Sequence, residues 1–402
     1  MSKSDYTEMR RSVTRGLLRS FRVGFGLPRL CMPSQHRDVL LCCNMPLAAD
    51  YLGSFWRLFR QDPRLRFRVL ATWPLIASRC EEDIAHVRTR LPIPETHRFW
   101  AYARPWDLTV CSDHCLNGEI RPKQAIFIGH GPHNKSYNGG MVTYTYGQSI
   151  RDGKGRFIYT RIFEERETNR EQALQADPSL KDLIAVVGSL ENDRLLEQSR
   201  RREEFRRRMG YERDDVVVFV LSTWGESCLL HTMGVELLEQ ARRLQSEFKF
   251  IFSAHPHEYR PRTDGGRVWG EYLRSQKAQG FAIREPSEDW IPYMVASDIV
   301  VSDHTGLVEP AALLEKPIIV VPVPDGLIWK HSATWQIRRF APTLHDATML
   351  RDCLHRVKTD YPYDELHELA QTLNPYPGEA ATRIRKEVYG LLGIPPAPVS
   401  PD

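Results

Sequence analysis

The sequence predicts an α/β fold in which two Rossmann-like, doubly wound domains face a cleft. The chain has 402 residues, which is more than one hydrophobic core usually organises. In both halves, short apolar runs of strand type alternate with helical patterns, and this alternation indicates parallel sheets covered by helices. Hydrophobic residues make up 42% of the chain and charged residues 26%, as in ordinary globular proteins.

Apolar runs in the first half predict buried strands. They are Asp38–Asn44, Arg66–Trp73, Leu108–Ser112, Gln124–Gly129 and Leu183–Gly188. A charged helix is expected over Glu191–Met209, and the domain junction is placed near it. The first domain, expected to bind the acceptor, thus takes residues 1–200, and the second, expected to bind a nucleotide donor, takes residues 201–402.

The second half repeats the pattern more clearly. Its predicted strands are Val216–Ser222, Lys249–Ala254, Asp298–Ser302 and Pro317–Val321. In doubly wound domains ligands bind beyond the carboxyl ends of the strands, so the residues that follow these strands are the candidates for function. A helical pattern at Ala380–Leu392 is a candidate to cross back onto the first domain.

Composition and charge restrict the class of protein. No run approaches the roughly 18–20 apolar residues of a spanning helix, and no signal peptide is evident, so we expect a cytoplasmic protein. A net charge of +4 is small for this length and predicts no nucleic-acid partner. Residues 7–30 alternate arginines with apolar residues, which suits either a basic amphipathic helix on the inner face of the membrane or a solvated surface helix.

A polar turn after the strand at Asp298–Ser302 is the most informative segment. Its candidate ligands for a diphosphate are Ser302, Asp303, His304, Thr305 and Gly306. Hydroxyls and free N–H groups where a helix begins attract anions. Capping of the helix is the alternative, but capping accounts for only one such residue. One turn further, Glu309 is a candidate acceptor for a ribose or glycerol hydroxyl.

Two histidines follow the strand at Lys249–Ala254. His255 and His257 are candidates to hydrogen-bond a diphosphate or, when protonated, to stabilise a leaving phosphate. Their spacing also suits a metal, but no companion ligand occurs at a recognisable spacing, so we expect neither a metal nor another cofactor. Ser222 and Thr223 end the first strand of the second domain and are candidates either to contact the nucleotide or to cap the next element.

A third histidine, His130, ends the strand at Gln124–Gly129. Gly129 and Gly131 flank it and allow a ligand to approach the backbone closely. A neutral imidazole at this edge can take the proton from an attacking hydroxyl. A structural role in the turn is the alternative for a histidine considered alone.

In this order the segments resemble the CDP-glycerol glycerophosphotransferase family, the TagF- and TagB-like enzymes of teichoic acid and capsule biosynthesis, which have the GT-B fold. The matching motifs are His130-Gly131, Gly188–Asp193, Thr223-Trp224, His255–His257, Ser302–Gly306 and Leu313–Pro317. They cover about Gln124 to Pro322. Two departures stand out, because Thr305-Gly306 replaces the family's usual serine pair and Glu309 replaces an apolar or aromatic residue.

The resemblance implies roles for these residues. His130 would be the general base, His255 and His257 would engage the phosphates of the donor, and Ser302, Asp303 and Thr305 would hold the diphosphate. It also implies a metal-independent enzyme that acts at the inner membrane face.

The leading hypothesis is a transferase that moves glycerol phosphate, or a similar alcohol phosphate, from a CDP-activated donor to a hydroxyl acceptor and releases CMP. The acceptor would be a glycan, a polyol or a lipid-linked molecule. An alternative keeps the fold but uses a nucleotide sugar, as a glycosyltransferase or an epimerase-like enzyme, and Glu309 favours this reading. A non-catalytic partner with a decayed site is a further alternative, against which the retained histidines and Asp303 argue.

Overall fold

The computed structural model describes residues 36–72, 75, 81–113, 116, 120, 122–129, 131, 136–137, 142–143, 146, 150–259 and 268–398. The chain divides into two compact units. One holds the chain up to residue 130, residues 149–163 and residues 384–402, and the other holds residues 131–148 and 164–383. These units are defined by contacts within the chain and do not test the predicted boundary between the two domains near residue 200, which stays a prediction. The basic helix expected over residues 7–30 lies outside the described residues.

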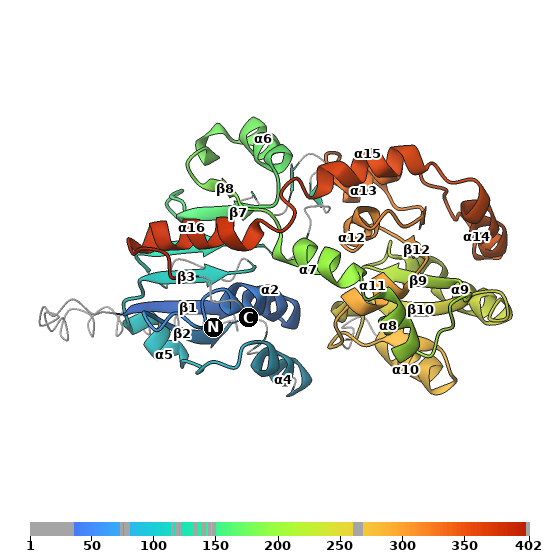
Figure 1. Ribbon diagram of the computed structural model, residues 1–402, viewed down its shortest axis with the longest axis horizontal. Coiled ribbons are helices and arrows are strands. Elements are labelled where there is room, and N and C mark those ends of the chain that lie inside the picture. Colours follow the sequence, from blue (N-terminus) through green and yellow to red (C-terminus); the bar gives the residue numbers. More distant parts are fainter. Residues whose placement is uncertain are drawn as a thin grey trace, which may run out of the picture. The chain divides into compact units, whose positions relative to one another are not determined.

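A six-stranded sheet carries the first Rossmann-like arrangement, with strand order β2-β1-β3-β4-β7-β8 (Figure 1). The strands are β1 (Arg37–Cys43), β2 (Leu65–Ala71), β3 (Leu108–Cys111), β4 (Gln124–Phe127), β7 (Arg161–Glu164) and β8 (Ile184–Val186). The pairings from β2 to β7 are parallel. Residues 39–43 of β1 are fully buried, because helices cover both faces of a parallel sheet.

A five-stranded parallel sheet forms the core of the second arrangement, with strand order β11-β10-β9-β12-β13. Its strands are β9 (Val217–Ser222), β10 (Lys249–Ala254), β11 (Ala282–Arg284), β12 (Ile299–Ser302) and β13 (Ile318–Val320). Every residue of the central strand β9 is buried. The predicted α/β class with two parallel sheets is therefore confirmed. A two-stranded antiparallel sheet pairs β5 (Ser136–Tyr137) with β6 (Val142–Thr143).

Helices fill the intervals between strands. The α-helices are α2 (Pro46–Arg57), α4 (Glu81–Arg90), α5 (Arg98–Ala103), α6 (Glu167–Ala176), α7 (Leu190–Ser199), α8 (Arg202–Arg208), α9 (Leu229–Arg243), α10 (Trp269–Ala278), α11 (Ile291–Ala296), α12 (Val308–Leu313), α13 (Ala333–Ile337), α14 (Leu350–Thr359), α15 (Tyr363–Leu373) and α16 (Ala380–Leu392). The short 3₁₀ helices are η3 (Pro178–Leu180), η4 (Pro256–Tyr259), η5 (Asp325–Leu327) and η6 (Ala347–Met349). Among the described residues no helix combines the length and the apolar character needed to cross a bilayer.

The prediction of one continuous helix over Glu191–Met209 is wrong, because the structure has α7 and α8 there. The backbone leaves the helical conformation at Arg201, which has φ −97° and ψ 18°. The break sets the direction of α8, so that the buried Arg206 donates to the carbonyl oxygens of Glu212 at 2.8 Å and Ala296 at 3.1 Å. Charge-assisted hydrogen bonds of this kind are stronger than neutral ones and stabilise the arrangement.

Residues of α16 beyond Arg383 belong to the first unit. Tyr389 donates its hydroxyl to Asp62 at 2.9 Å, and Arg385 donates to the carbonyl oxygen of Leu58 at 2.5 Å. The side-chain hydrogen bond from Arg64 is the largest influence on Asp62 and helps to lower the pKa of that carboxyl to about 2. Asp62 and the carbonyl oxygen of Leu58 thus hold the second half of α16 in the first unit.

Candidate functional site

The carboxyl ends of β9, β10 and β12 meet at one edge of the five-stranded sheet. In the parallel register Ser222 is opposite Ala254, and Ser302 is opposite Leu221. The residues that follow these strands therefore gather at this edge. The structure brings together the predicted site residues Ser222, Thr223, His255, His257 and Ser302–Gly306.

Asp303 is the centre of the hydrogen bonds at this edge, and its side chain is buried. Its carboxylate accepts the backbone N–H of Thr223 at 3.0 and 3.1 Å, of Leu229 at 2.9 Å and of Thr305 at 3.0 Å. The hydroxyl of Ser222 lies 3.2 Å from the same carboxylate. Asp303 therefore fixes the loop after β9 and the first turn of α9.

The polar turn is not explained by capping of the helix that follows it. The N-cap residue of α12 is Leu307, whose apolar side chain accepts no hydrogen bond from the N–H groups of the first turn. Asp303 and Ser222 instead serve α9, where the Ser222 hydroxyl accepts the N–H of Leu230 at 3.2 Å. Asp303 and Ser222 therefore do cap a helix, but it is α9 and not the helix that follows the turn. A direct role of Asp303 and Ser222 in phosphate binding stays a prediction.

Two buried hydroxyls at this edge have no hydrogen-bond partner among the described residues. They belong to Thr223, which is 1% exposed, and Ser302, which is fully buried. An unsatisfied buried hydroxyl costs about 1–3 kcal/mol, so a bound water or ligand is the ordinary explanation for such a group. His304 beside them is buried, while Thr305 and Gly306 are half-buried. Binding of a diphosphate by this part of the turn stays a prediction.

Glu309 does not stand alone at the start of α12. Arg166, just before α6, donates to its two carboxylate oxygens at 2.6 and 2.9 Å, and both side chains are buried. Burial opposes the charge of Arg166, but the neighbouring Glu309 raises the pKa of the guanidinium above its ordinary value on balance. Arg166 also donates to the carbonyl oxygen of Leu373 at 3.2 Å and to the side chain of Asn169 at 3.1 Å. The expected contact of Glu309 with a ribose hydroxyl stays a prediction, and it would use the remaining lone pairs of this carboxylate.

His255 and His257 form a stacked pair at the end of β10. Their ring centroids are 4.9 Å apart at an interplanar angle of 23°. The backbone N–H of His257 donates to Nδ1 of His255 at 3.1 Å, so a neutral His255 carries its proton on Nε2. Trp224 lies 5.3 Å from the His257 ring and is 44% exposed. These rings give the edge an aromatic surface with hydrogen-bond donors.

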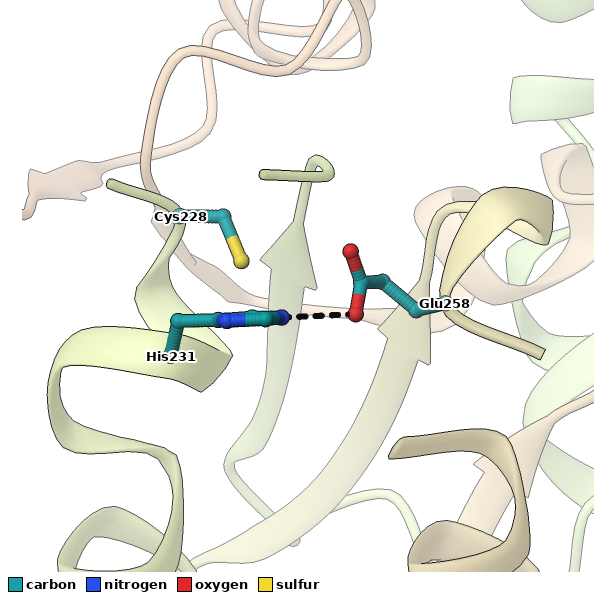
Figure 2. A group of neighbouring side chains, drawn as sticks. All are labelled: Cys228, His231 and Glu258. Carbon is teal, nitrogen blue, oxygen red and sulfur yellow. Dashed lines mark hydrogen bonds and ion pairs between the residues drawn. The ribbon is translucent and has the colours of Figure 1, made fainter. Parts of the chain in front are cut away.

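A third group at this edge, which sequence reasoning missed, consists of Cys228, His231 and Glu258 (Figure 2). One ligand atom from each side chain lies within 4.8 Å of the others, and Nε2 of His231 is 2.8 Å from Glu258. Burial raises the pKa of the Cys228 thiol to about 11, which makes it a poor nucleophile. The signal in the sequence was the Cys-x-x-His spacing at the start of a helix.

Two of the recognised motifs hold structure together. Asp193 accepts the backbone N–H of Gly378 at 2.7 Å and of Ala380 at 3.2 Å, so the Gly188–Asp193 segment receives the start of α16. Lys316 is buried and donates to the carbonyl oxygen of Ser297 at 2.5 Å, which ties the end of α11 to β13. Neither side chain is positioned by these contacts to act on a substrate.

The predicted base, His130, lies outside the described residues. Its two neighbours are described, and both have left-handed backbone conformations, with φ 68° at Gly129 and φ 132° at Gly131. Such angles are strained for residues with a side chain, so the flanking glycines are required by the turn itself. The role of His130 stays a prediction.

Comparison with solved structures identifies the fold. The wall teichoic acid polymerase TagF superposes with a TM-score of 0.60 at 12% identity, covering 98% of both chains. A histidine variant of TagF soaked with CDPG gives 0.62 at 13% identity over the same shares. The resemblance predicted from the motifs is therefore confirmed at the level of the fold. The sequence matches no family model and no curated protein.

Further solved structures, both with a bound uridine nucleotide, share the fold as well. The UDP-GlcNAc 2-epimerase from Neisseria meningitidis, bound to UDP-GlcNAc, has a TM-score of 0.52 at 15% identity and covers 88% of this chain and 100% of its own. MnaA of S. aureus with UDP has a TM-score of 0.55 at 12% identity, over 89% and 98% of the two chains. The TM-scores show a GT-B-like fold. At identities this low, the substrate has to be argued from the residues of the site.

Proposed function

We propose that the chain is a transferase that binds a nucleotide-activated donor at the carboxyl edge of the β9–β13 sheet. It moves an alcohol-phosphate group, such as glycerol phosphate, from a CDP-activated donor to a hydroxyl acceptor and releases CMP. The observation that carries this proposal is the pair of buried hydroxyls of Thr223 and Ser302, which have no hydrogen-bond partner in the described part of the chain, at the same sheet edge as the stacked His255 and His257. A diphosphate bound at this edge would supply acceptor oxygens for these donors once the turns open enough to expose them.

The chemistry of the transfer follows from this arrangement. The acceptor oxygen attacks the phosphorus that carries the alcohol, a new P–O bond forms, and the bond to the bridging oxygen of the diphosphate breaks. CMP leaves with the bridging oxygen, and His130 takes the proton of the acceptor hydroxyl. His255, with a proton on Nε2, and His257 would stabilise the charge that develops on the leaving phosphate. Most of the rate enhancement would come from positioning and charge stabilisation.

Asp303 would act through the backbone. By holding the amides of Thr223 and Thr305 it sets the shape of the two turns that would face the diphosphate. The hydroxyl of Thr305 and the N–H groups of His304 and Gly306 would complete the cradle, as donors at a strand end suit phosphate oxygens.

A second candidate is a glycosyl transfer or epimerisation that uses a nucleotide sugar. The observation that favours it is the fixed carboxylate of Glu309, held on both oxygens by Arg166. A carboxylate at this position is suited to accept hydroxyls of a ribose or sugar and unsuited to contact a second phosphate. Proteins of the same fold have UDP or UDP-GlcNAc bound.

The test supplies purified protein with CDP-alcohols and, separately, UDP-, GDP-, CMP- and CDP-sugars, together with polyol, glycan and lipid-linked acceptors. The released nucleotide is identified by chromatography. CMP from a CDP-alcohol, lost in His130→Ala and kept in His367→Ala, supports phosphotransfer with a histidine base. His367 is an exposed histidine of α15 paired with Glu315, which makes it a matched control. A nucleoside diphosphate from a sugar donor refutes the CDP-alcohol reaction and supports the second candidate.

The peripheral membrane location is a separate part of the proposal. Its support is the series of arginines interleaved with apolar residues over residues 7–30, a pattern suited to anionic lipid. Sedimentation with vesicles that contain anionic lipid, compared with neutral vesicles and with a variant whose arginines in this segment are replaced by glutamine, tests it. Equal sedimentation of both proteins refutes the membrane contact.

A further inference from the structure

Cys228, His231 and Glu258 bring three different metal-binding groups to one point between α9 and η4. A thiol, an imidazole and a carboxylate each offer an atom within 4.8 Å of the other two. Figure 2 shows the three side chains converging from two separate elements. We propose that these residues form a binding site for a single zinc ion. This inference goes beyond the proposed transferase reaction and does not depend on it.

The donor set suits zinc among the divalent cations. Thiolate and imidazole are ligands of borderline-soft metals, whereas calcium and magnesium take oxygen ligands. Zinc binds sulfur at about 2.3 Å and nitrogen or oxygen at about 2.0–2.2 Å, so tetrahedral ligand atoms lie roughly 3.3–3.7 Å apart. The group reaches this spacing with small side-chain movements, since the His231–Glu258 distance of 2.8 Å has to widen only slightly. Three ligands leave the fourth position for water.

The backbone prearranges the three side chains. Cys228 is the N-cap residue of α9 and His231 follows one turn later, so both lie on the same side of the helix start. The carbonyl oxygen of Gly225 accepts the N–H of Cys228 at 3.0 Å, and the N–H of Gly225 donates to Oε1 of Glu258 at 3.2 Å. Gly225 can do both because it has φ 98°, a conformation that favours glycine. The second oxygen of Glu258 is thereby directed toward His231, as outer-shell bonds orient metal ligands.

The local charge also favours a cation. Glu258 is buried, and Asp303 is a further acidic neighbour of Cys228. A buried carboxylate needs charged or hydrogen-bonded partners, and among the described residues Glu258 has the N–H of Gly225 on Oε1 and the imidazole of His231 on Oε2. Zinc would replace the proton between Nε2 of His231 and Glu258. The thiol proton would leave to solvent, and the neutral imidazole would keep its proton on Nδ1.

A metal here would connect two of the turns at the carboxyl edge of the sheet. Glu258 adjoins His257 in η4, and Cys228 neighbours the Ser222 hydroxyl that helps to hold α9. Zinc would therefore lock the loop after β9 to the loop after β10. If no metal binds, the group is an ordinary hydrogen-bonded His231–Glu258 pair next to the buried thiol of Cys228.

The experiment uses the full chain without an affinity tag, stripped of metal and titrated with Zn²⁺ alone against a chromogenic chelator. We expect one zinc per chain. Titration with Co²⁺ should give thiolate-to-cobalt charge-transfer absorption, which reports the Cys228 ligand directly. Loss of an outer-shell partner already costs about 10–100-fold in metal affinity, so Cys228→Ser should lower zinc affinity by at least about 100-fold and abolish the cobalt band.

Cys353→Ser is the matched control, because Cys353 is also a buried free cysteine of the second unit. It should bind zinc as the wild type does. Zinc should raise the thermal midpoint of the wild type and of Cys353→Ser but not that of Cys228→Ser. If a ligand variant does not fold, the wild-type stoichiometry and cobalt spectrum still decide. Absence of a stoichiometric zinc, or a cobalt complex without thiolate absorption, overturns the site, whatever the outcome of the donor assays.

Discussion

The carboxylate of Asp303, directly after β12, accepts the backbone N–H of Leu229 at the start of α9 at a distance of 2.9 Å. Asp303 was expected to hold a ligand, but in the structure its carboxylate binds backbone N–H groups of the loops at its own edge of the sheet. The same carboxylate holds the N–H groups of Thr223 and Thr305, so the loops after β9 and β12 share one acceptor. The shape of the proposed donor site therefore depends on one buried charge.

Replacement of Asp303 by asparagine should destabilise the fold by about 3 kcal/mol, the cost of leaving buried hydrogen-bond donors without their acceptor. The amide has one acceptor oxygen where the carboxylate has two, and its NH₂ group would face buried N–H donors that lose their partner. The free energy of unfolding from urea titration measures the loss. Asp346→Asn is the control, because Asp346 caps the exposed start of η6 through Thr348 and, among the described residues, its carboxylate has hydrogen bonds only to that residue. A loss at Asp303 no larger than that at Asp346 would contradict the structural role.

The Arg166–Glu309 pair predicts an asymmetry between single and double substitutions. Arg166→Met leaves the buried Glu309 carboxylate without its ion-pair partner, which should cost about 3–5 kcal/mol in the free energy of unfolding. Glu309→Leu should be costly for the same reason. The double variant Arg166→Met/Glu309→Leu removes both charges and should be more stable than either single variant.

A double-mutant cycle by urea unfolding measures this coupling. The exposed pair of Arg88 and Glu95, at 2.8 Å, is the matched control with the same chemistry outside the core. Its substitutions should add without a measurable coupling, as expected of surface ion pairs. Additive losses at Arg166 and Glu309 would mean that the pair is not coupled as the structure shows it.

The fold could be predicted because strands of a parallel sheet are apolar on both faces. Residues 217–222 and 39–43 form such runs, and their order along the chain fixed the class. The sequence did not reveal β7 and β11, because charged residues interrupt both apolar runs: β7 begins with Arg161 and ends with Glu164, and β11 ends with Arg284. The break between α7 and α8 was hidden for a different reason, since the Arg206 contacts that stabilise it depend on tertiary structure.

The candidate site was predictable as positions and not as contacts. Polar residues after β9, β10 and β12 had to meet, because the carboxyl ends of parallel strands share an edge. The sequence did not predict which of these side chains hydrogen-bond to one another. The partner of Glu309 lies 143 positions away at Arg166, and that of His231 lies in a different loop at Glu258. Neither pairing leaves a periodic or spaced pattern in a single sequence.

Trp224 should contribute to nucleotide binding by stacking. It is exposed beside the His257 ring, and stacking of a base on an aromatic side chain is worth about 1–3 kcal/mol. Trp224→Ala should therefore weaken binding of CMP, CDP or UDP by about tenfold or more in calorimetric titrations. Trp100→Ala, at an exposed tryptophan of the first unit, is the control and should bind as the wild type does. Equal affinities for both variants would remove Trp224 from the site.

Lys316 predicts how stability depends on pH. Burial, assisted by Arg202, lowers the pKa of the Lys316 ammonium from 10.5 to about 7. Below this pKa the lysine is charged in both the folded and the unfolded chain, so the cost of burying the charge is present in full. Between about pH 7 and pH 10.5 the folded chain has lost the proton that the unfolded chain still binds, and stability from this group rises with pH.

Lys316→Met should abolish that rise. Relative to the variant, the wild type should gain about 2 kcal/mol in the free energy of unfolding between pH 7 and pH 9, because one pKa unit corresponds to about 1.4 kcal/mol. Urea titrations of both proteins across this range measure the difference, and Lys277→Met, at a partly exposed lysine of α10, should follow the wild type. A constant difference between wild type and Lys316→Met would show that the carbonyl oxygen of Ser297 keeps the buried ammonium charged throughout. Lys316 would then stay charged at every pH in this range and link the end of α11 to β13 by its hydrogen bond to Ser297.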